Sequence, residues 1–97
     1  MLLIAVKLIA KPGQIDGLLN FLSQAAAHAR KEAGVLVYDF YKSIENVDTL
    51  FMHEVYRDQA ALDEHRFKMQ PFHDQLIALL NESPEVSVWV PLPSNEE

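Results

Sequence analysis

A histidine and a glutamate, His65 and Glu54, have the types and spacing best suited to proton transfer in this chain. His65 follows Leu62 by three residues and Ala61 by four, so it shares their side of a helix with 3.6 residues per turn. That side is apolar and faces the interior, where a histidine requires a hydrogen-bond partner. Glu54 on the preceding predicted strand is the candidate partner, and the two side chains would then form a general acid or base.

Both residues also have a structural explanation, which the sequence leaves open. A buried histidine bonded to a carboxylate can simply hold a helix against a sheet. Glu54 lies in the middle of a predicted strand, where glutamate is disfavoured. It either orients His65 or pairs with an Arg or Lys across the sheet.

Aromatic side chains could supply the walls of a pocket for a planar ligand. The candidates are Tyr38, Phe40, Tyr56 and Phe72, with His73 near the inner edge of a third predicted helix. Taken singly, aromatic residues of strands and helices more often belong to the core. His28 and His53 are predicted boundary residues without a chemical role.

Periodic apolar patterns predict one domain over residues 1–97, with a polar tail at about residues 94–97 that should fray. Strands are predicted at about residues 2–10, 35–43, 49–56 and 85–92, and helices at about 14–32, 59–67 and 72–81. Gly34 is predicted to follow the last turn of the first helix, and Asp58 to cap the second. The order β-α-β-β-α-β predicts an α+β, ferredoxin-like fold: an antiparallel four-stranded sheet with helices on one face.

Both faces of the predicted sheet are apolar, although a one-sided helix layer covers only one. On the second strand, Leu36, Tyr38 and Phe40 share one face, and Val37, Asp39 and Tyr41 share the other. Monomers rarely leave so large an apolar face in water, so we expect a twofold homodimer through the sheet. Its interface should involve Val37, Tyr41, Phe51 and Val55 or their opposite-face neighbours.

Composition excludes several classes of protein. The net charge of −6 and the scattered basic residues argue against a nucleic-acid partner. There is no cysteine, which excludes disulfides, thiol nucleophiles and cysteine zinc sites. The apolar start, Met1–Val6, is too short for a signal segment or a membrane span, so we expect a cytoplasmic protein with no membrane partner. Nucleotide-binding, nucleophile-elbow and metalloprotease motifs are absent, and the four histidines lack metal-site spacing, so no cofactor and no metal are expected.

Three segments together resemble the antibiotic biosynthesis monooxygenase (ABM) domain family, over about residues 3–90. They are Lys11-Pro12-Gly13, Arg30-Lys-Glu-Ala-Gly34-Val-Leu-Val-Tyr38, and a strand at residues 50–57 that passes directly into Asp58-Gln-Ala-Ala-Leu-Asp-Glu-His65. The resemblance implies a dimeric α+β barrel, and it places a histidine after an Ala-Leu pair, as here. The chain departs from the family in having Tyr56 where Trp is commoner, and His73 after the aromatic Phe72 rather than before one.

For function, the resemblance implies a small monooxygenase that oxidises a quinol or reduced polycyclic aromatic substrate with O2, without flavin, haem or metal. His65, assisted by Glu54, would remove the phenol proton, with Tyr38 and Phe72 as walls. An isomerase or processing enzyme for a small phosphosugar-like signalling molecule is an alternative on the same fold, and so is a non-catalytic binding or stress-response module. The isomerase would require Arg30, Lys42, Arg57 and Arg66 to converge on a phosphate. Haem-degrading relatives carry other residues at the positions of Val6, His65 and Leu76.

Overall fold

The predicted strands and helices form in the predicted order in the computed structural model, which describes residues 1–93. The elements are β1 (Leu2–Ile9), α1 (Ile15–Ala29), β2 (Val35–Lys42), β3 (Thr49–Tyr56), α2 (Gln59–Met69), the 3-10 turn η1 (Gln70–Phe72), α3 (His73–Leu79) and β4 (Glu85–Trp89). The tail at residues 94–97, which we expected to fray, lies outside the described residues.

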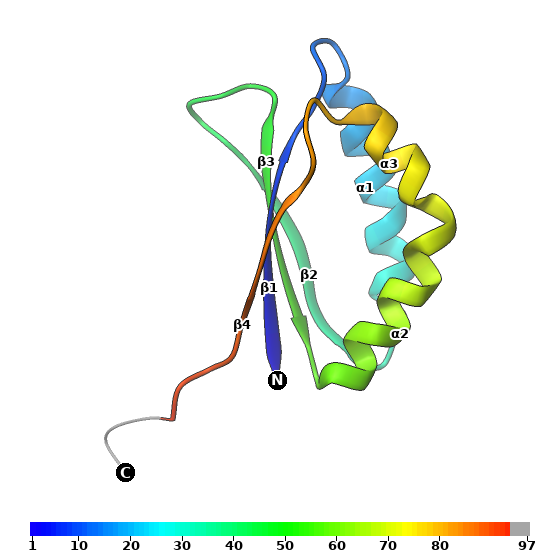
Figure 1. Ribbon diagram of the computed structural model, residues 1–97, viewed down its shortest axis with the longest axis vertical. Coiled ribbons are helices and arrows are strands. Elements are labelled where there is room, and N and C mark those ends of the chain that lie inside the picture. Colours follow the sequence, from blue (N-terminus) through cyan, green and yellow to red (C-terminus); the bar gives the residue numbers. More distant parts are fainter. Residues whose placement is uncertain (94–97) are drawn as a thin grey trace.

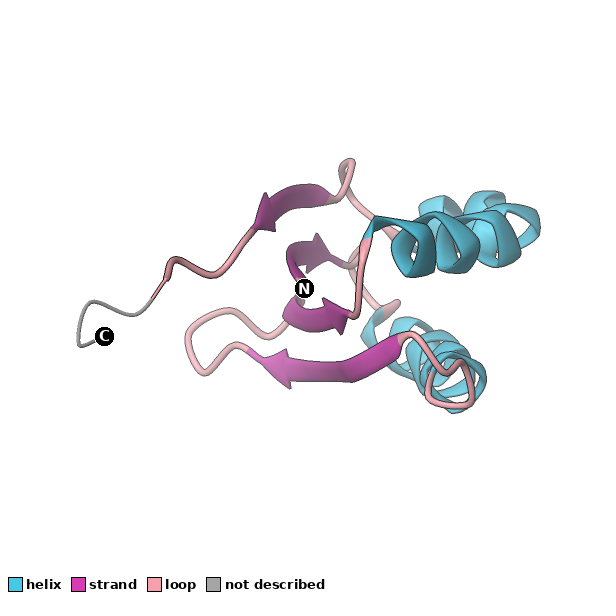
Figure 2. Ribbon diagram, turned by 90° about the horizontal axis from the view of Figure 1, so that it is seen from below, coloured by secondary structure: helices cyan, strands magenta, loops and turns pink. Residues whose placement is uncertain are grey.

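The four strands form one sheet in the order β2-β3-β1-β4, and every neighbouring pair is antiparallel. Figure 1 shows α1, α2 and α3 stacked beside the sheet, and Figure 2 shows that all three lie on the same side of it. The fold is therefore the predicted α+β ferredoxin-like sheet with helices on one face. Among residues 1–93, no helix combines the length and the apolar character that a membrane crossing requires.

Helix α2 begins where the sequence predicts, because Asp58 caps it. The Asp58 side chain accepts a hydrogen bond from the backbone N–H of Ala61 at 2.9 Å. This bond to the ionised form holds the pKa of Asp58 below its ordinary value. The cap sets the start of the helix immediately after β3, and so sets the position of His65 two turns later.

Gly34 does not have the role that we predicted. Helix α1 ends at Ala29, with Arg30 as its C-cap residue, so Gly34 lies well beyond the last turn. A methyl group on Gly34 would lie only 2.4 Å from the Cβ of Ala61 on α2. Glycine is required there because α2 packs directly against this backbone.

A bulge in β2 changes which side chains face the helices. Val35 is paired with Tyr56 and Val37 with Val55, so Leu36 is an extra residue in the ladder. Leu36 is about half exposed and does not share the buried environment of Tyr38, contrary to the simple alternation expected from the sequence.

The core lies between the helices and the inner face of the sheet. Its largest fully buried side chains are Leu8, Leu18, Leu50 and Tyr56. The opposite face of the sheet is open in the single chain, and large apolar side chains remain exposed on it. Tyr41 is 51 % exposed, Phe51 44 % and Trp89 58 %. The structure thus identifies the open face as the one that carries Tyr41 and Phe51, which the sequence left undecided.

Candidate active site

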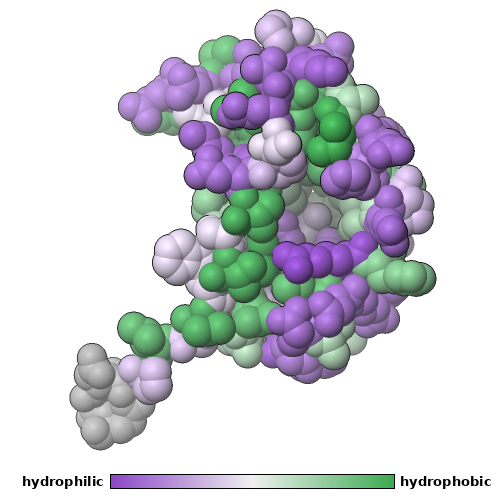
Figure 3. Space-filling model, viewed as in Figure 1, coloured by the Kyte–Doolittle hydropathy of each residue, from purple (hydrophilic) through white to green (hydrophobic). Residues whose placement is uncertain are grey.

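A cavity of about 680 Å³ lies between the inner face of the sheet and the helices. Figure 3 shows the hollow between the strand side and the helix side of the molecule. Most of its wall is apolar, with Ile4, Val6 and Met52 from the sheet and Phe21, Leu22 and Leu62 from the helices. A cavity of this size and lining can enclose a small organic molecule and exclude much of the water around it.

His65 reaches this cavity from α2, and its hydrogen-bond partner is Glu32. The Nδ1 atom of His65 lies 2.9 Å from Oε2 of Glu32, and their side chains are only 6 % and 11 % exposed. The predicted pairing of His65 with Glu54 is therefore wrong. Glu54 points from the middle of β3, whereas Glu32 comes from the turn after α1 and approaches the histidine from the helix layer.

Glu54 instead bonds to a tyrosine of its own strand. The hydroxyl of Tyr56 donates to Oε1 of Glu54 at 2.5 Å, and both residues are buried. Burial is the main cause that raises the pKa of Glu54, because it disfavours the charged form. The Tyr56 hydrogen bond and the positive charges of His65 and Arg66 oppose this rise.

Two tyrosines hold the imidazole of His65 in place. The ring centroid of Tyr38 lies 5.2 Å from that of His65 in an edge arrangement, and that of Tyr56 lies 5.5 Å away. Burial, followed by the negative charge of Glu54, raises the pKa of both phenols. Both hydroxyls therefore remain protonated near neutral pH and act as hydrogen-bond donors.

The turn between α1 and β2 positions Glu32. Arg30 binds β2 through its guanidinium, which donates to the backbone oxygen of Tyr38 at 2.6 Å and to Oδ1 of Asp39 at 3.1 Å. Gly34 then allows α2 to pack against the same turn. Glu32 lies between these two anchored residues, and its side chain therefore contacts His65. The run Arg30-x-Glu32-x-Gly34 thus contains one residue that reaches the site and two that position it.

The Glu32–His65 contact determines what the imidazole can do. When Glu32 is ionised and the ring is neutral, the N–H is at Nδ1 and donates to the carboxylate. The other ring nitrogen, Nε2, then carries a lone pair. Within residues 1–93, no side-chain nitrogen or oxygen is both enclosed and without a hydrogen-bond partner, so Nε2 has access to open space. Because His65 lines the cavity, this nitrogen can accept a proton from a bound molecule.

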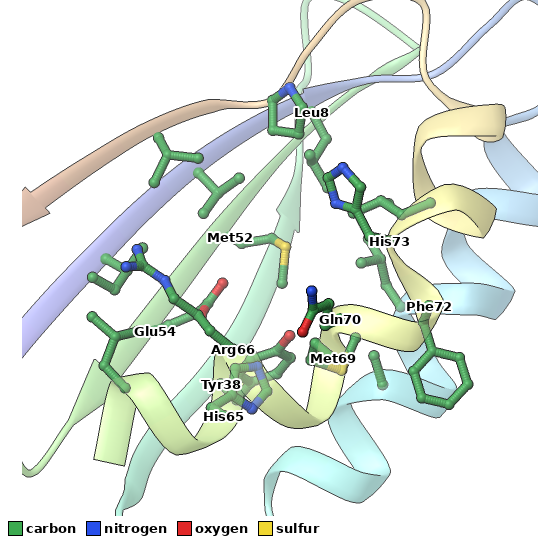
Figure 4. A pocket seen from close by; sticks show the side chains of 18 of the residues that line it. Leu8, Tyr38, Met52, Glu54, His65, Arg66, Met69, Gln70, Phe72 and His73 are labelled. Atoms are coloured by element: carbon green, nitrogen blue, oxygen red, sulfur yellow. The ribbon is translucent and has the colours of Figure 1, made fainter. Parts of the chain in front are cut away.

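Most of the side chains proposed from the sequence meet at this cavity. His65, Glu54, Tyr38, Tyr56, Phe72 and His73 all line it. Phe40 is not among the lining residues of the described chain; it packs against the core instead. Figure 4 shows His73 directed toward the cavity and the ring of Phe72 turned away from its centre. Phe72 is also 48 % exposed, and it belongs to η1, whereas the sequence predicted it as the first residue of the third helix.

Among the polar and flexible side chains of the site, sequence reasoning missed Glu32, Met52 and Gln70, and it named Arg66 only as a possible phosphate ligand. Glu32 could have been found from the sequence, since it lies in the segment from Arg30 to Tyr38 that resembles the family. Gln70 follows His65 by five residues and lies on η1, and no pattern distinguished it from a solvated side chain.

The basic residues that a phosphate site would require do not converge. Among Arg30, Lys42, Arg57 and Arg66, all in the described chain, only Arg66 lines the cavity. Arg30 pairs with Asp39, and Arg57 pairs with Asp58. Within residues 1–93, no group of three or more His, Asp or Glu side chains is arranged to hold a metal ion.

Comparison with known proteins identifies a matching family and several solved structures with the same fold. The family model described as "Antibiotic biosynthesis monooxygenase" matches residues 1–68. No curated protein matches the chain. Rv0793 from Mycobacterium tuberculosis is 28 % identical, with 97 % of each chain covered and a TM-score of 0.88. PA3566 from Pseudomonas aeruginosa is 29 % identical over 95 % of this chain and 94 % of that one, with a TM-score of 0.86. A structure described as an antibiotic biosynthesis monooxygenase shares the fold at 23 % identity, with 96 % and 100 % coverage and a TM-score of 0.87.

Proposed function

Since the chain belongs to the antibiotic biosynthesis monooxygenase family, we propose that it is a cofactor-independent monooxygenase acting on a quinol or reduced polycyclic aromatic substrate. The observation that supports this best is the His65–Glu32 contact at 2.9 Å beside a mostly apolar cavity of about 680 Å³. A planar aromatic molecule fits such walls, and a buried imidazole held by a carboxylate is suited to take its phenol proton.

The reaction begins with proton transfer from the phenol tautomer of the substrate to Nε2 of His65. Glu32 is a positioning residue that keeps the N–H at Nδ1 and stabilises the imidazolium that forms. The phenolate then passes one electron to O2, and the resulting carbon radical and superoxide combine, with the proton, as a hydroperoxide. Loss of water leaves a carbonyl. Overall, one ring CH2 group and one O2 become one C=O group and one water, so atoms and electrons balance.

The surroundings favour this sequence of steps. Apolar side chains such as Val6 and Met52 line the cavity and exclude water from it. Less water then solvates the substrate anion and the reactive intermediates. Tyr38 keeps its proton, because burial raises its pKa, and can donate to a developing oxygen anion, whereas the proton of Tyr56 is already donated to Glu54. Glu54 anchors Tyr56 and presents a largely buried carboxyl to the same space.

Oxidation of anthrone by the purified protein tests the proposal. Anthrone has a phenol tautomer, and its conversion to the quinone is followed by absorbance after subtraction of the uncatalysed rate. His65→Ala should lower turnover about 100-fold or more, the range for one positioned acid–base group. Gln59→Ala, at an exposed position on the same helix, is the control. Equal turnover by folded wild type and His65→Ala, or quinone oxygen that does not derive from labelled O2, would contradict the proposal.

We also propose that the protein is a homodimer through the open face of the sheet. That face exposes Tyr41, Phe51 and Trp89, and Tyr41 contacts Phe51 with ring centroids 6.2 Å apart. Burying these side chains against a second copy would remove a large apolar area from water. The helices lie on the other side of the sheet, so such a dimer leaves them exposed.

Light scattering tests the dimer. Wild type should show twice the chain mass of 11.0 kDa at micromolar concentration. Phe51→Lys should shift the mass toward the monomer, whereas Ile44→Lys, at a fully exposed loop residue, should not. A monomer mass for wild type across this range would remove the dimer.

A further inference from the structure

A second cavity, of about 430 Å³, lies on the outer side of the helix layer. Helix α1 forms one wall, and α2, η1 and α3 form the other. Four side chains line both this cavity and the first one: Phe21, Ala25, Met69 and Phe72. A single layer of side chains therefore separates the two spaces. The apolar side of the second cavity includes Phe72, which the core leaves half exposed.

The polar part of the second cavity is basic, although the whole chain carries a charge of −6. Lys31 and His28 lie on the α1 side, and Lys68 lies on the α2 side. The acidic side chain that lines it, Glu32, already contacts His65, and its other oxygen lies 4.0 Å from Nζ of Lys68. Gln24 and Gln75 add amide groups. Positive charge and N–H donors thus stand beside an apolar surface.

We propose that the second cavity binds an amphipathic anion, an apolar ring or short chain that carries one carboxylate. The apolar part lies against Met69 and Phe72, and the carboxylate is bound by Lys31 and Lys68. Lys68 pairs with Glu64 at 3.4 Å and with Glu32 at 4.0 Å, and its ammonium group has three N–H donors, so at least one remains for a ligand. The helix layer stays open in a dimer formed through the sheet, so this site remains accessible there.

The site also contacts the group that positions His65. Oε2 of Glu32 is 2.9 Å from Nδ1 of His65, and the same carboxylate lines the second cavity. A ligand carboxylate that draws Lys68 away weakens the ion pair between Lys68 and Glu32, which lies at 4.0 Å. Occupancy of the second cavity is therefore coupled to the imidazole that faces the first cavity. This inference needs no turnover, so it stands or falls independently of the proposed monooxygenase reaction.

Binding is tested by calorimetry with naphthoate as the probe. Naphthoate should bind, and naphthalenemethanol, its neutral analogue, should bind at least about 10-fold more weakly, a difference of about 1.4 kcal/mol. Lys31→Gln combined with Lys68→Gln should weaken naphthoate binding by a similar factor. Lys42→Gln, on an exposed residue of β2, is the matched charge control.

The location is tested by filling each cavity selectively. Gln75→Trp fills the second cavity and should abolish binding, whereas Asp74→Trp, on a neighbouring exposed residue that lines neither cavity, should not. Arg66→Gln changes only the first cavity and should leave binding unchanged. In wild type, naphthoate should also shift the ring-nitrogen NMR signals of His65.

Three results would overturn this proposal. The first is no naphthoate binding up to millimolar concentration. The second is equal binding of the neutral analogue. The third is binding that survives Gln75→Trp but is lost in Arg66→Gln, which would assign the ligand to the first cavity.

Discussion

Two largely enclosed glutamates lie close to His65, yet their hydrogen-bond partners differ in kind. Glu32 has cationic or potentially cationic neighbours, with His65 at 2.9 Å and Lys68 at 4.0 Å. Glu54 is bonded to the neutral hydroxyl of Tyr56, and burial raises its pKa. The partner, more than the depth of burial, therefore assigns the role of each carboxylate: Glu32 positions the proton acceptor, and Glu54 anchors a tyrosine.

The difference follows from the elements that carry the two residues. A side chain in a strand points along a fixed direction and shares its face with the residue two positions away, as Glu54 does with Tyr56. A residue in a turn between anchored neighbours is not limited in this way. Glu32 can therefore reach across to α2, a different element, and contact a residue 33 positions later in the sequence.

The largest effect expected from this comparison is on turnover. Glu32→Gln should lower the rate of anthrone oxidation about 10- to 100-fold, because the amide no longer favours the N–H at Nδ1 or stabilises the imidazolium. Glu54→Gln should lower it less than about 10-fold, because the amide oxygen still accepts from Tyr56. Initial rates at saturating substrate measure both. A larger loss for Glu54→Gln would reverse the assignment of the two carboxylates.

A second prediction concerns a substitution that disturbs only the Glu32 side of the site. Gly34→Ala places a methyl group 2.4 Å from the Cβ of Ala61, so α2 must shift, at a cost of about 1–3 kcal/mol in unfolding free energy. Gly17→Ala is the control, because its methyl group would meet Leu79 at 3.4 Å, and stability should stay within about 1 kcal/mol of wild type. Denaturant unfolding gives both values. Equal stability of the two variants would show that Gly34 does not set the approach of α2.

The smallest effect concerns the pH dependence that Glu54 contributes. Burial raises the pKa of Glu54 above 4.5, its value in the unfolded chain. Between the unfolded and the folded pKa, the folded state therefore binds more protons than the unfolded state. Stability from this group is therefore fully present below about pH 4.5 and falls as pH rises through the window. Glu54→Gln removes the fall, so its melting temperature relative to wild type should increase with pH above 4.5 and then level off. A relative melting temperature that declines over this range would contradict the raised pKa.

Periodicity and turn residues were sufficient to predict the architecture. The cap at Asp58, the strand at residues 49–56 and the order of elements depend on local patterns, and each is found in the structure. His65 was predicted to face inward for the same reason, since its distance from Ala61 and Leu62 fixes its side of α2.

The contacts between elements could not be predicted in the same way. The pairing of His65 with Glu32 depends on where the α1–β2 turn lies against α2, and this is set by the close approach of Gly34 to Ala61. A one-residue bulge at Leu36 likewise follows from the pairing of β2 with β3 and leaves no mark in the alternation of apolar residues. Proximity in sequence made Glu54 the obvious partner, but Glu54 is bonded to Tyr56 instead.

The ring-nitrogen NMR spectrum of His65 tests most directly whether Glu32, and not Glu54, holds the imidazole. It is recorded for wild type, Glu32→Gln and Glu54→Gln under conditions where the ring is neutral. We predict that wild type and Glu54→Gln both carry the proton at Nδ1, and that Glu32→Gln loses this preference. A spectrum that changes in Glu54→Gln and stays the same in Glu32→Gln would contradict the account.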